Sequence, residues 1–178
     1  MLGILHFAQD DVYITYFFFM NPQSHPVVGH IHLTVADLER ALWFYRDLLG
    51  FTVTSRYGDS AVFLSAGGYH HHIGLNTWNG VGAPSAPPGY TGMYHVAFLY
   101  PDRRSLATVV RRILDAGYQL EGAADHGVSE AIYLRDPDNN GVELYVDRPK
   151  EQWQVSNDGM VEMVTERLDL NSLLAEAE

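Results

Sequence analysis

The sequence predicts an α+β fold in which two β-α-β-β-β modules form a curled mixed sheet around a shared cavity. Two strand-helix-strand patterns follow one another along the chain, over residues 27–80 and 92–148. In both patterns the helix is preceded by Asp and followed by Gly. Internal repeats of this kind place equivalent elements in adjacent halves. With 178 residues, of which 47% are hydrophobic, the chain can bury one such core.

The first module begins with Val27–Val35 (VVGHIHLTV), which has the apolar, β-branched composition of a strand. Asp37 is the expected N-cap of a helix, because apolar residues at helical spacing follow it as far as Leu49. Gly50 then suits the position just after the helix. Three further strands are expected at residues 51–57, 60–66 and 70–78.

After a Gly- and Pro-rich linker, the second module repeats this order. Met93–Tyr100 is predicted to be a strand and Ser105–Ala116 a helix, which begins after Asp102 and ends at Gly117. Strands are expected at Tyr118–Gly122, Glu130–Arg135 and Gly141–Val146. We expect the turn over residues 136–141 (DPDNNG) to be structural, because Pro fixes φ while Asn and Gly tolerate left-handed backbone.

The two ends of the chain differ from this repeat. Residues 1–26 are aromatic and predict an added arm of unknown role, with translation from Met20 as an alternative. Residues 149–178 form a polar tail, in which Leu168–Leu174 predicts a short amphipathic helix. We expect this helix to cover one edge of the fold rather than to bind a partner.

The composition narrows the classes of function. A net charge of -11 argues against binding to nucleic acid, which requires a basic face. No segment reaches the roughly 18 apolar residues of a membrane span, so a cytoplasmic protein without membrane contact is expected. Because the chain has no Cys, any bound metal must be held by nitrogen and oxygen ligands.

A candidate metal centre follows from the repeat. His30 and His95 occupy equivalent positions in the first strands of the two modules. Glu143 lies in mid-strand between apolar neighbours, where a carboxylate is costly to bury without a cation or hydrogen bonds. Two imidazoles and one carboxylate on one face of an octahedral ion leave up to three positions open, which suits Fe(II), with Mn(II) as an alternative. Zn²⁺ would be satisfied with water as a fourth ligand. Gly74 leaves vacant the place of a fourth protein ligand, which disfavours isomerases that use four.

Further side chains are predicted around this centre. His71, with His70 and His72 as alternatives, is a candidate proton carrier, because imidazole titrates near neutral pH. Tyr133 is a candidate hydrogen-bond donor, with a packing role as the alternative. His126 is a candidate donor at the mouth of the cavity, or else a turn residue.

His32 shows what is expected of a histidine that lacks an equivalent in the other module. It shares a strand face with His30, but its counterpart in the second module is Ala97. We therefore expect it to pack or to line the cavity rather than to bind metal.

The chain resembles the vicinal oxygen chelate superfamily, which includes glyoxalase I, fosfomycin and bleomycin resistance proteins and extradiol dioxygenases. The resemblance covers residues 28–148 and rests on Gly29-His30, LTVADLERA at 33–41, FYRDLLGF at 44–51, Tyr94-His95 and DPDNNGVELY at 136–145. Within it, SAGGYHHHIGLN at 65–76 and HGVSEAIYL at 126–134 are most similar to catechol 2,3-dioxygenase-like proteins.

This resemblance implies Fe(II) held by His30, His95 and Glu143, with His71 and Tyr133 in the active site. It also implies a homodimer that uses O₂ to cleave the ring of an aromatic diol. One departure is that the position nine residues before the tyrosine, a His in larger extradiol enzymes, is Ala124 here. Two alternatives remain open: a glyoxalase-type or fosfomycin-resistance-type metal-dependent lyase or transferase, and a metal-free binding protein similar to bleomycin resistance proteins.

Overall fold

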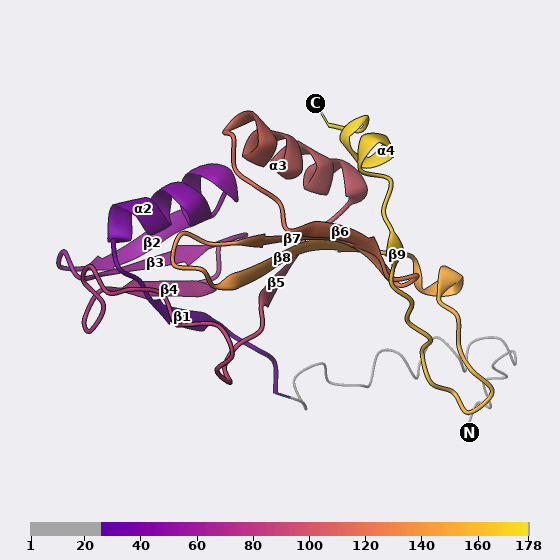
Figure 1. Cartoon of the computed structure of the whole chain (residues 1–178), viewed down its shortest axis with the longest axis horizontal. Helices are drawn as coiled ribbons and strands as arrows, with labels where there is room; N and C mark the ends of the chain where they lie inside the picture. Colours follow the sequence, from indigo (N-terminus) through magenta and orange to yellow (C-terminus); the bar gives the residue numbers. More distant parts are fainter. Residues whose placement is uncertain (1–25, 178) are drawn as a thin grey trace, which may run out of the picture.

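Two mixed sheets lie next to each other, with the first helix of each module on the same side of them (Figure 1). The structure is a computed structural model that describes residues 26–177. The arm predicted for residues 1–26 therefore lies outside the described residues, apart from its last residue. None of the described helices is long and apolar enough to cross a membrane.

The first module contains β1 (Ile31–Thr34), α2 (Leu38–Leu42), η1 (Trp43–Leu48), β2 (Thr52–Tyr57), β3 (Ala61–Ser65) and β4 (Ile73–Asn76). The second module contains β5 (Val96–Leu99), α3 (Arg103–Asp115), β6 (Gly122–Asp125), β7 (Ser129–Arg135) and β8 (Gly141–Asp147). The chain then ends with η2 (Lys150–Gln152), β9 (Glu166–Arg167) and α4 (Leu170–Leu174).

The strand order confirms the predicted α+β fold and its internal repeat. The first sheet has the order β1-β4-β3-β2, and the second has β5-β8-β7-β6, with β9 added at its edge. In both sheets the first strand pairs in parallel with the last strand of its module. Within residues 26–177 the strands form two mixed sheets, one in each module, and no closed barrel.

The predicted helix ends are confirmed by local hydrogen bonds and by backbone geometry. Asp37 and Asp102 each cap a helix by accepting a bond from the backbone N–H three residues later, at 2.8 and 2.7 Å. Gly50 and Gly117 follow the helices with φ of 91° and 72°, a conformation that is favourable mainly for glycine. The first helix widens to π-type winding from Trp43, with the side chains of Phe44, Tyr45, Leu48 and Leu49 buried.

The DPDNNG turn lies in the second module and forms hydrogen bonds with the first. Asp136 is buried and accepts a hydrogen bond from the hydroxyl of Tyr45, at 2.9 Å. Asp138 accepts bonds from the backbone N–H of Ala36, at 3.2 Å, and from the guanidinium of Arg40, at 2.6 Å. The expectation of a structural turn is confirmed, and the contacts with the first module add a role that the sequence did not indicate.

The expected strand at Tyr118–Gly122 was misplaced, because β6 begins only at Gly122. Tyr118 instead packs its ring against Phe44, with centroids 5.3 Å apart. Its hydroxyl donates to the carbonyl of Arg135, at 2.8 Å. The segment before β6, which contains Tyr118, is therefore a packed connection between α3 and the sheet.

The tail follows the side of the second sheet and returns to α3 (Figure 1). Leu168 and Leu173 are buried, and α4 packs against α3. Arg103 of α3 pairs with Glu176 and, at 2.7 Å, with the buried Glu130. The short helix thus covers one edge of the fold, and the two-residue strand β9 that precedes it was not predicted.

Candidate metal centre

His95 and Glu143 meet on the face of the second sheet that lies away from the helices. Glu143 lies in β8 between Val142 and Leu144, whose buried side chains point to the helix side, so its own side chain points the other way. Ala97 of β5 is its register neighbour, and the small side chain leaves room for the carboxylate. The Nε2 of His95 lies 2.9 Å from Oε2 of Glu143.

Tyr133 and His126 extend this pair into a chain of polar contacts. Tyr133 of β7 pairs in register with Glu143, and its hydroxyl lies 3.3 Å from Oε1. The same hydroxyl lies 2.7 Å from Nε2 of His126, which follows β6. Desolvation, followed by the charge and hydrogen bond of Glu143, raises the pKa of Tyr133 to about 12. The phenol therefore keeps its proton at neutral pH and can serve as a donor.

A cavity of about 370 Å³ opens beside this chain of contacts. Its lining includes His95, Tyr133 and His126, together with Thr165 from the C-terminal segment. Ala124 also lines it, and its small side chain leaves space where a larger residue would intrude. Imidazole and phenol groups thus line a space of the size that binds small molecules, and the carboxylate of Glu143 lies next to two of them, His95 and Tyr133.

The histidines of the first module form a separate cluster. His30 directly precedes β1, and its ring lies against that of His71, with centroids 4.5 Å apart. Desolvation, followed by the neighbouring imidazoles of His30 and His70, lowers the pKa of His71. His72 turns its Nδ1 toward Ser65 instead, at 3.2 Å. Of the three successive histidines, His71 is therefore the one in ring contact with His30.

The structure places the predicted site residues in two groups. His95, Glu143, Tyr133 and His126 lie together in the second module, whereas His30 and His71 lie together in the first. Within residues 26–177, no group of three His, Asp or Glu side chains is placed so that it could hold one metal ion. The two modules of one chain therefore present incomplete parts of the predicted ligand set.

Gly74 does not leave an empty position. A Cβ atom built on Gly74 would lie 2.8 Å from the ring of His32. That ring also packs against Trp78 and Phe63, with centroids 5.4 and 5.8 Å apart. The ring of His32 thus fills the space that we expected to be vacant. Its packing agrees with the expectation that His32, whose counterpart in the second module is Ala97, is not a metal ligand.

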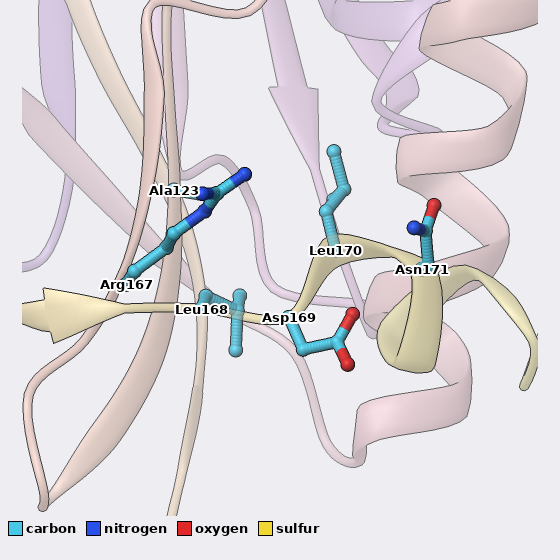
Figure 2. Close-up of a pocket in the computed structure, with 6 residues that line it drawn as sticks. All are labelled: Ala123, Arg167, Leu168, Asp169, Leu170 and Asn171. Atoms are coloured by element: carbon cyan, nitrogen blue, oxygen red, sulfur yellow. The ribbon is translucent and has the colours of Figure 1, made fainter.

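A larger cavity, of about 530 Å³, lies between β9 and α4 (Figure 2). Six residues line it: Ala123, Arg167, Leu168, Asp169, Leu170 and Asn171. This lining has one carboxylate and no imidazole, so its donors do not suit the predicted metal. The smaller cavity, near Glu143, is the better candidate for a metal site, because imidazoles of His95 and His126 line it. The volume of a cavity does not indicate whether it binds metal.

Sequence reasoning missed the contact between His126 and the C-terminal segment. Nδ1 of His126 lies 2.8 Å from the carbonyl oxygen of Val164, 38 residues away in the sequence. Neither residue lies in a recognisable motif shared with the other. Only the pairing of β9 with β6 brings them together.

Comparisons with known proteins agree with this architecture. Residues 27–144 match the family described as the Glyoxalase/Bleomycin resistance protein/Dioxygenase superfamily. Catechol-2,3-dioxygenase of Bacillus subtilis (strain 168) is 39% identical over 150 residues, covering 84% of this chain and 52% of that protein. Biphenyl-2,3-diol 1,2-dioxygenase 3 of Rhodococcus globerulus is 33% identical over 123 residues, covering 68% and 64%.

A solved structure shows the same fold. The crystal structure of a glyoxalase/dioxygenase from Nostoc punctiforme matches with a TM-score of 0.60 and 20% sequence identity, covering 72% of this chain and 95% of that one. The chain spans about half the length of the Bacillus protein. The family match nevertheless runs from the start of the first module into the last strand of the second and includes every predicted metal ligand. The chain therefore belongs to the glyoxalase/bleomycin resistance protein/dioxygenase superfamily.

Proposed function

We propose that this protein is an Fe(II)-dependent extradiol dioxygenase that uses O₂ to cleave the ring of a catechol-type diol. The observation that carries the proposal is the contact of His95 with Glu143, at 2.9 Å, beside a cavity that Tyr133 and His126 also line. The two relatives named for cleaving aromatic diols support the same reaction class.

The donors at this position suit a divalent metal. His95 offers an imidazole nitrogen, and Glu143 offers a carboxylate whose side chain is only 12% exposed. A carboxylate in so little water is stabilised by a cation. Nitrogen and oxygen ligands of this kind hold Fe(II) or Mn(II). When bound, the metal would supply Lewis acidity and open positions for the diol and O₂.

The surrounding side chains would handle protons. Tyr133 keeps its hydroxyl proton, because its pKa is raised to about 12, and its oxygen can accept a hydrogen bond from a substrate hydroxyl. In the first module, His71 lies against His30 and is suited to accept a proton, because its lowered pKa leaves the imidazole neutral at pH 7. It would join this site only together with His30. His126 would exchange a proton with Tyr133 across their 2.7 Å contact.

We propose that the complete centre forms in a homodimer, in which His30 of the partner subunit is the third ligand. The repeat supports this arrangement, because a twofold axis can place the first module of each chain against the second module of the other and so form two equal sites. Large apolar side chains beside both histidines are exposed: Val28 is 90% exposed next to the His30 segment, and Tyr94 is 81% exposed next to His95. Clustered exposed apolar residues are typical of protein interfaces.

Anaerobic reconstitution with Fe(II), followed by addition of O₂ and a panel of catechols, tests the activity. We expect a yellow ring-opened product with the wild-type protein and none with His95→Ala. Metal content is measured on the same samples, so that iron binding is established independently of turnover. Bound iron without turnover on any of a broad panel of catechols would exclude the dioxygenase function.

Mixing of inactive variants tests the shared site. His30→Ala and Glu143→Ala are each expected to abolish stoichiometric metal binding. If chains are unfolded together and refolded, about half of the dimers contain one chain of each kind, and each such dimer has one intact site. We therefore expect about a quarter of the wild-type iron content and activity, by this counting of symmetric dimers. Full loss in the mixture would show that each chain must complete its own site.

A further inference from the structure

We infer that residues 164–167, here called the C-terminal arm, are a positioning element of the candidate site. The carbonyl of Val164 selects the tautomer of His126 that turns a hydrogen-bond acceptor toward Tyr133. The importance of this contact for turnover rests on the proposed function, in which Tyr133 faces the substrate. The tautomer itself is a property of the folded chain and can be measured without metal.

The arm is fixed to the edge of the second sheet. In β9, Arg167 pairs in register with Ala124 of β6, and Glu166 pairs with Asp125. The backbone N–H of Val164 donates to the carbonyl of His126, at 3.1 Å. Directly after the arm, Leu168 is buried, and its side chain points away from that of Arg167 in the close-up (Figure 2). The carbonyl of Val164 is therefore held in place by contacts on both sides of it.

This carbonyl decides which nitrogen of His126 carries the proton. Nδ1 lies 2.8 Å from the oxygen of Val164, and a carbonyl oxygen can only accept a hydrogen bond. If the neutral ring carried its proton on Nε2, two lone pairs would face each other at this distance. The hydroxyl of Thr165 is a competing partner for Nδ1, but it lies 3.4 Å away. The shorter contact favours a proton on Nδ1.

A proton on Nδ1 makes Nε2 of the neutral ring an acceptor. The hydroxyl of Tyr133, 2.7 Å from Nε2, then has His126 as its nearer acceptor, and its contact with Glu143 is longer, at 3.3 Å. The phenol can take a proton from a substrate hydroxyl on its oxygen while passing its own proton to Nε2. The resulting imidazolium has both N–H groups hydrogen-bonded, one to Val164 and one to Tyr133.

The loop that carries His126 has anchors that do not involve its side chain. Asp125 accepts a hydrogen bond from the guanidinium of Arg148 at 2.5 Å, and Arg148 also pairs with Glu130 at 2.9 Å. The backbone N–H of His126 donates to the carbonyl of Ser129, at 2.8 Å. The imidazole is thus not required to close the loop, so a substitution at His126 tests its chemistry rather than the fold.

Nitrogen-15 NMR of the histidine rings in the metal-free full-length protein tests the inference. The signals of His126 are assigned by their loss in His126→Gln. We expect the Nδ1–H tautomer in the wild-type protein. We also expect it in Tyr133→Phe, because Val164 rather than the phenol selects it. An Nε2–H ring in the wild-type protein, or loss of the Nδ1–H form in Tyr133→Phe, would overturn the inference.

A second variant tests the arm itself. Val164→Pro removes the N–H that bonds to His126 and loosens the arm. We expect loss of the Nδ1–H preference and a roughly tenfold lower kcat with KM within about twofold, since a proton carrier is impaired. Met163→Pro, one residue before the arm and with a side chain that is 65% exposed, is the control and should change neither. An unchanged tautomer and kcat in Val164→Pro would contradict the inference.

The two proposals fail in different ways. A wild-type protein that shows the Nδ1–H tautomer but binds no iron and opens no catechol ring would refute the proposed function alone. A protein that turns over catechols but holds His126 as the Nε2–H tautomer would refute the role of the arm alone. Circular dichroism and the Tm of each variant separate unfolding from either result.

Discussion

The two modules have the same strand order, but they differ in which of two paired strands has the larger side chain. In the first module His32 of β1 stands opposite Gly74 of β4, whereas in the second module Ala97 of β5 stands opposite Glu143 of β8. The large residue belongs to the first strand in one module and to the last strand in the other. In both pairs the smaller partner provides the space that the larger side chain uses.

This difference gives the two modules different surroundings on the same backbone: a packed aromatic face in the first and the candidate metal site in the second. The ring of His32 covers Gly74 and lies against Trp78, so the first module fills its open face with aromatic contacts. In the second module Ala97 leaves the carboxylate of Glu143 free to meet His95. One module thus presents a carboxylate with an imidazole, and the other presents imidazoles alone. The modules of a duplicated fold need not be functionally equivalent.

The largest effect is expected from removal of Glu143, the carboxylate that the second module has where the first has Gly74. Glu143→Ala should lower Fe(II) affinity by more than the roughly 10–100-fold loss that follows removal of an outer hydrogen-bond partner of a ligand. Titration of the apo-protein with Fe(II) under anaerobic conditions measures this. Glu151→Gln, at an exposed site in η2, is the matched control and should bind metal normally. Equal affinities of the two variants would rule out Glu143 as a ligand.

Glycine substitutions in the two modules should differ in cost. A Cβ on Gly141 would lie 2.0 Å from the backbone oxygen of Tyr94, which cannot move without the strand. A Cβ on Gly74 would meet only a side-chain ring, at 2.8 Å. We expect Gly141→Ala to lower the free energy of unfolding by about 3 kcal/mol, at the upper end for overpacking, and Gly74→Ala by about 1 kcal/mol. Urea unfolding curves measure both, and a reversed order would contradict this account.

The contact between the modules can be weakened without changing either sheet. Tyr45→Phe removes the hydroxyl that donates to the buried carboxylate of Asp136, at 2.9 Å. We expect a loss of about 1.5 kcal/mol, typical of a hydrogen bond to a charged group. Tyr100→Phe removes a longer contact between the modules, 3.4 Å to the carbonyl of Leu49, and should cost less. Equal thermal unfolding curves for the two variants would show that the turn does not link the modules energetically.

The smallest effect concerns the imidazole cluster of the first module. The pKa of His71 is lowered from its usual value of 6.5, mainly by desolvation. The folded protein therefore binds fewer protons than the unfolded chain near and below pH 6.5, so stability should fall as the pH drops through this range. His71→Gln should reduce this loss of stability between pH 7.5 and 5.5. We expect the reduction to be about 0.5 kcal/mol or less, because solvent screens the site. Urea midpoints at pH 7.5 and 5.5 measure it, and a steeper slope in the variant would contradict the assignment.

Much of the fold could be predicted because its signals are local. Asp37 and Asp102 mark helix starts, Gly50 and Gly117 mark helix ends, and each signal involves only neighbouring residues. The strand at Tyr118–Gly122 was misplaced because an aromatic residue suits both a strand and a packed connection. Its contact with Phe44 depends on a helix more than 70 residues away.

The sequence by itself determined the duplicated βαβββ order, because apolar periodicity and caps are short-range properties of the chain. It also indicated candidate side chains for the chemistry, since imidazoles recurred at equivalent positions of the two modules and Glu143 stood among apolar neighbours. Only the tertiary structure decided how these residues are grouped. The meeting of His95 with Glu143, the separation of His30 from both, and the contact of Val164 with His126 depend on strand pairing and module packing. Such contacts join segments far apart in the chain, and no local pattern encodes them.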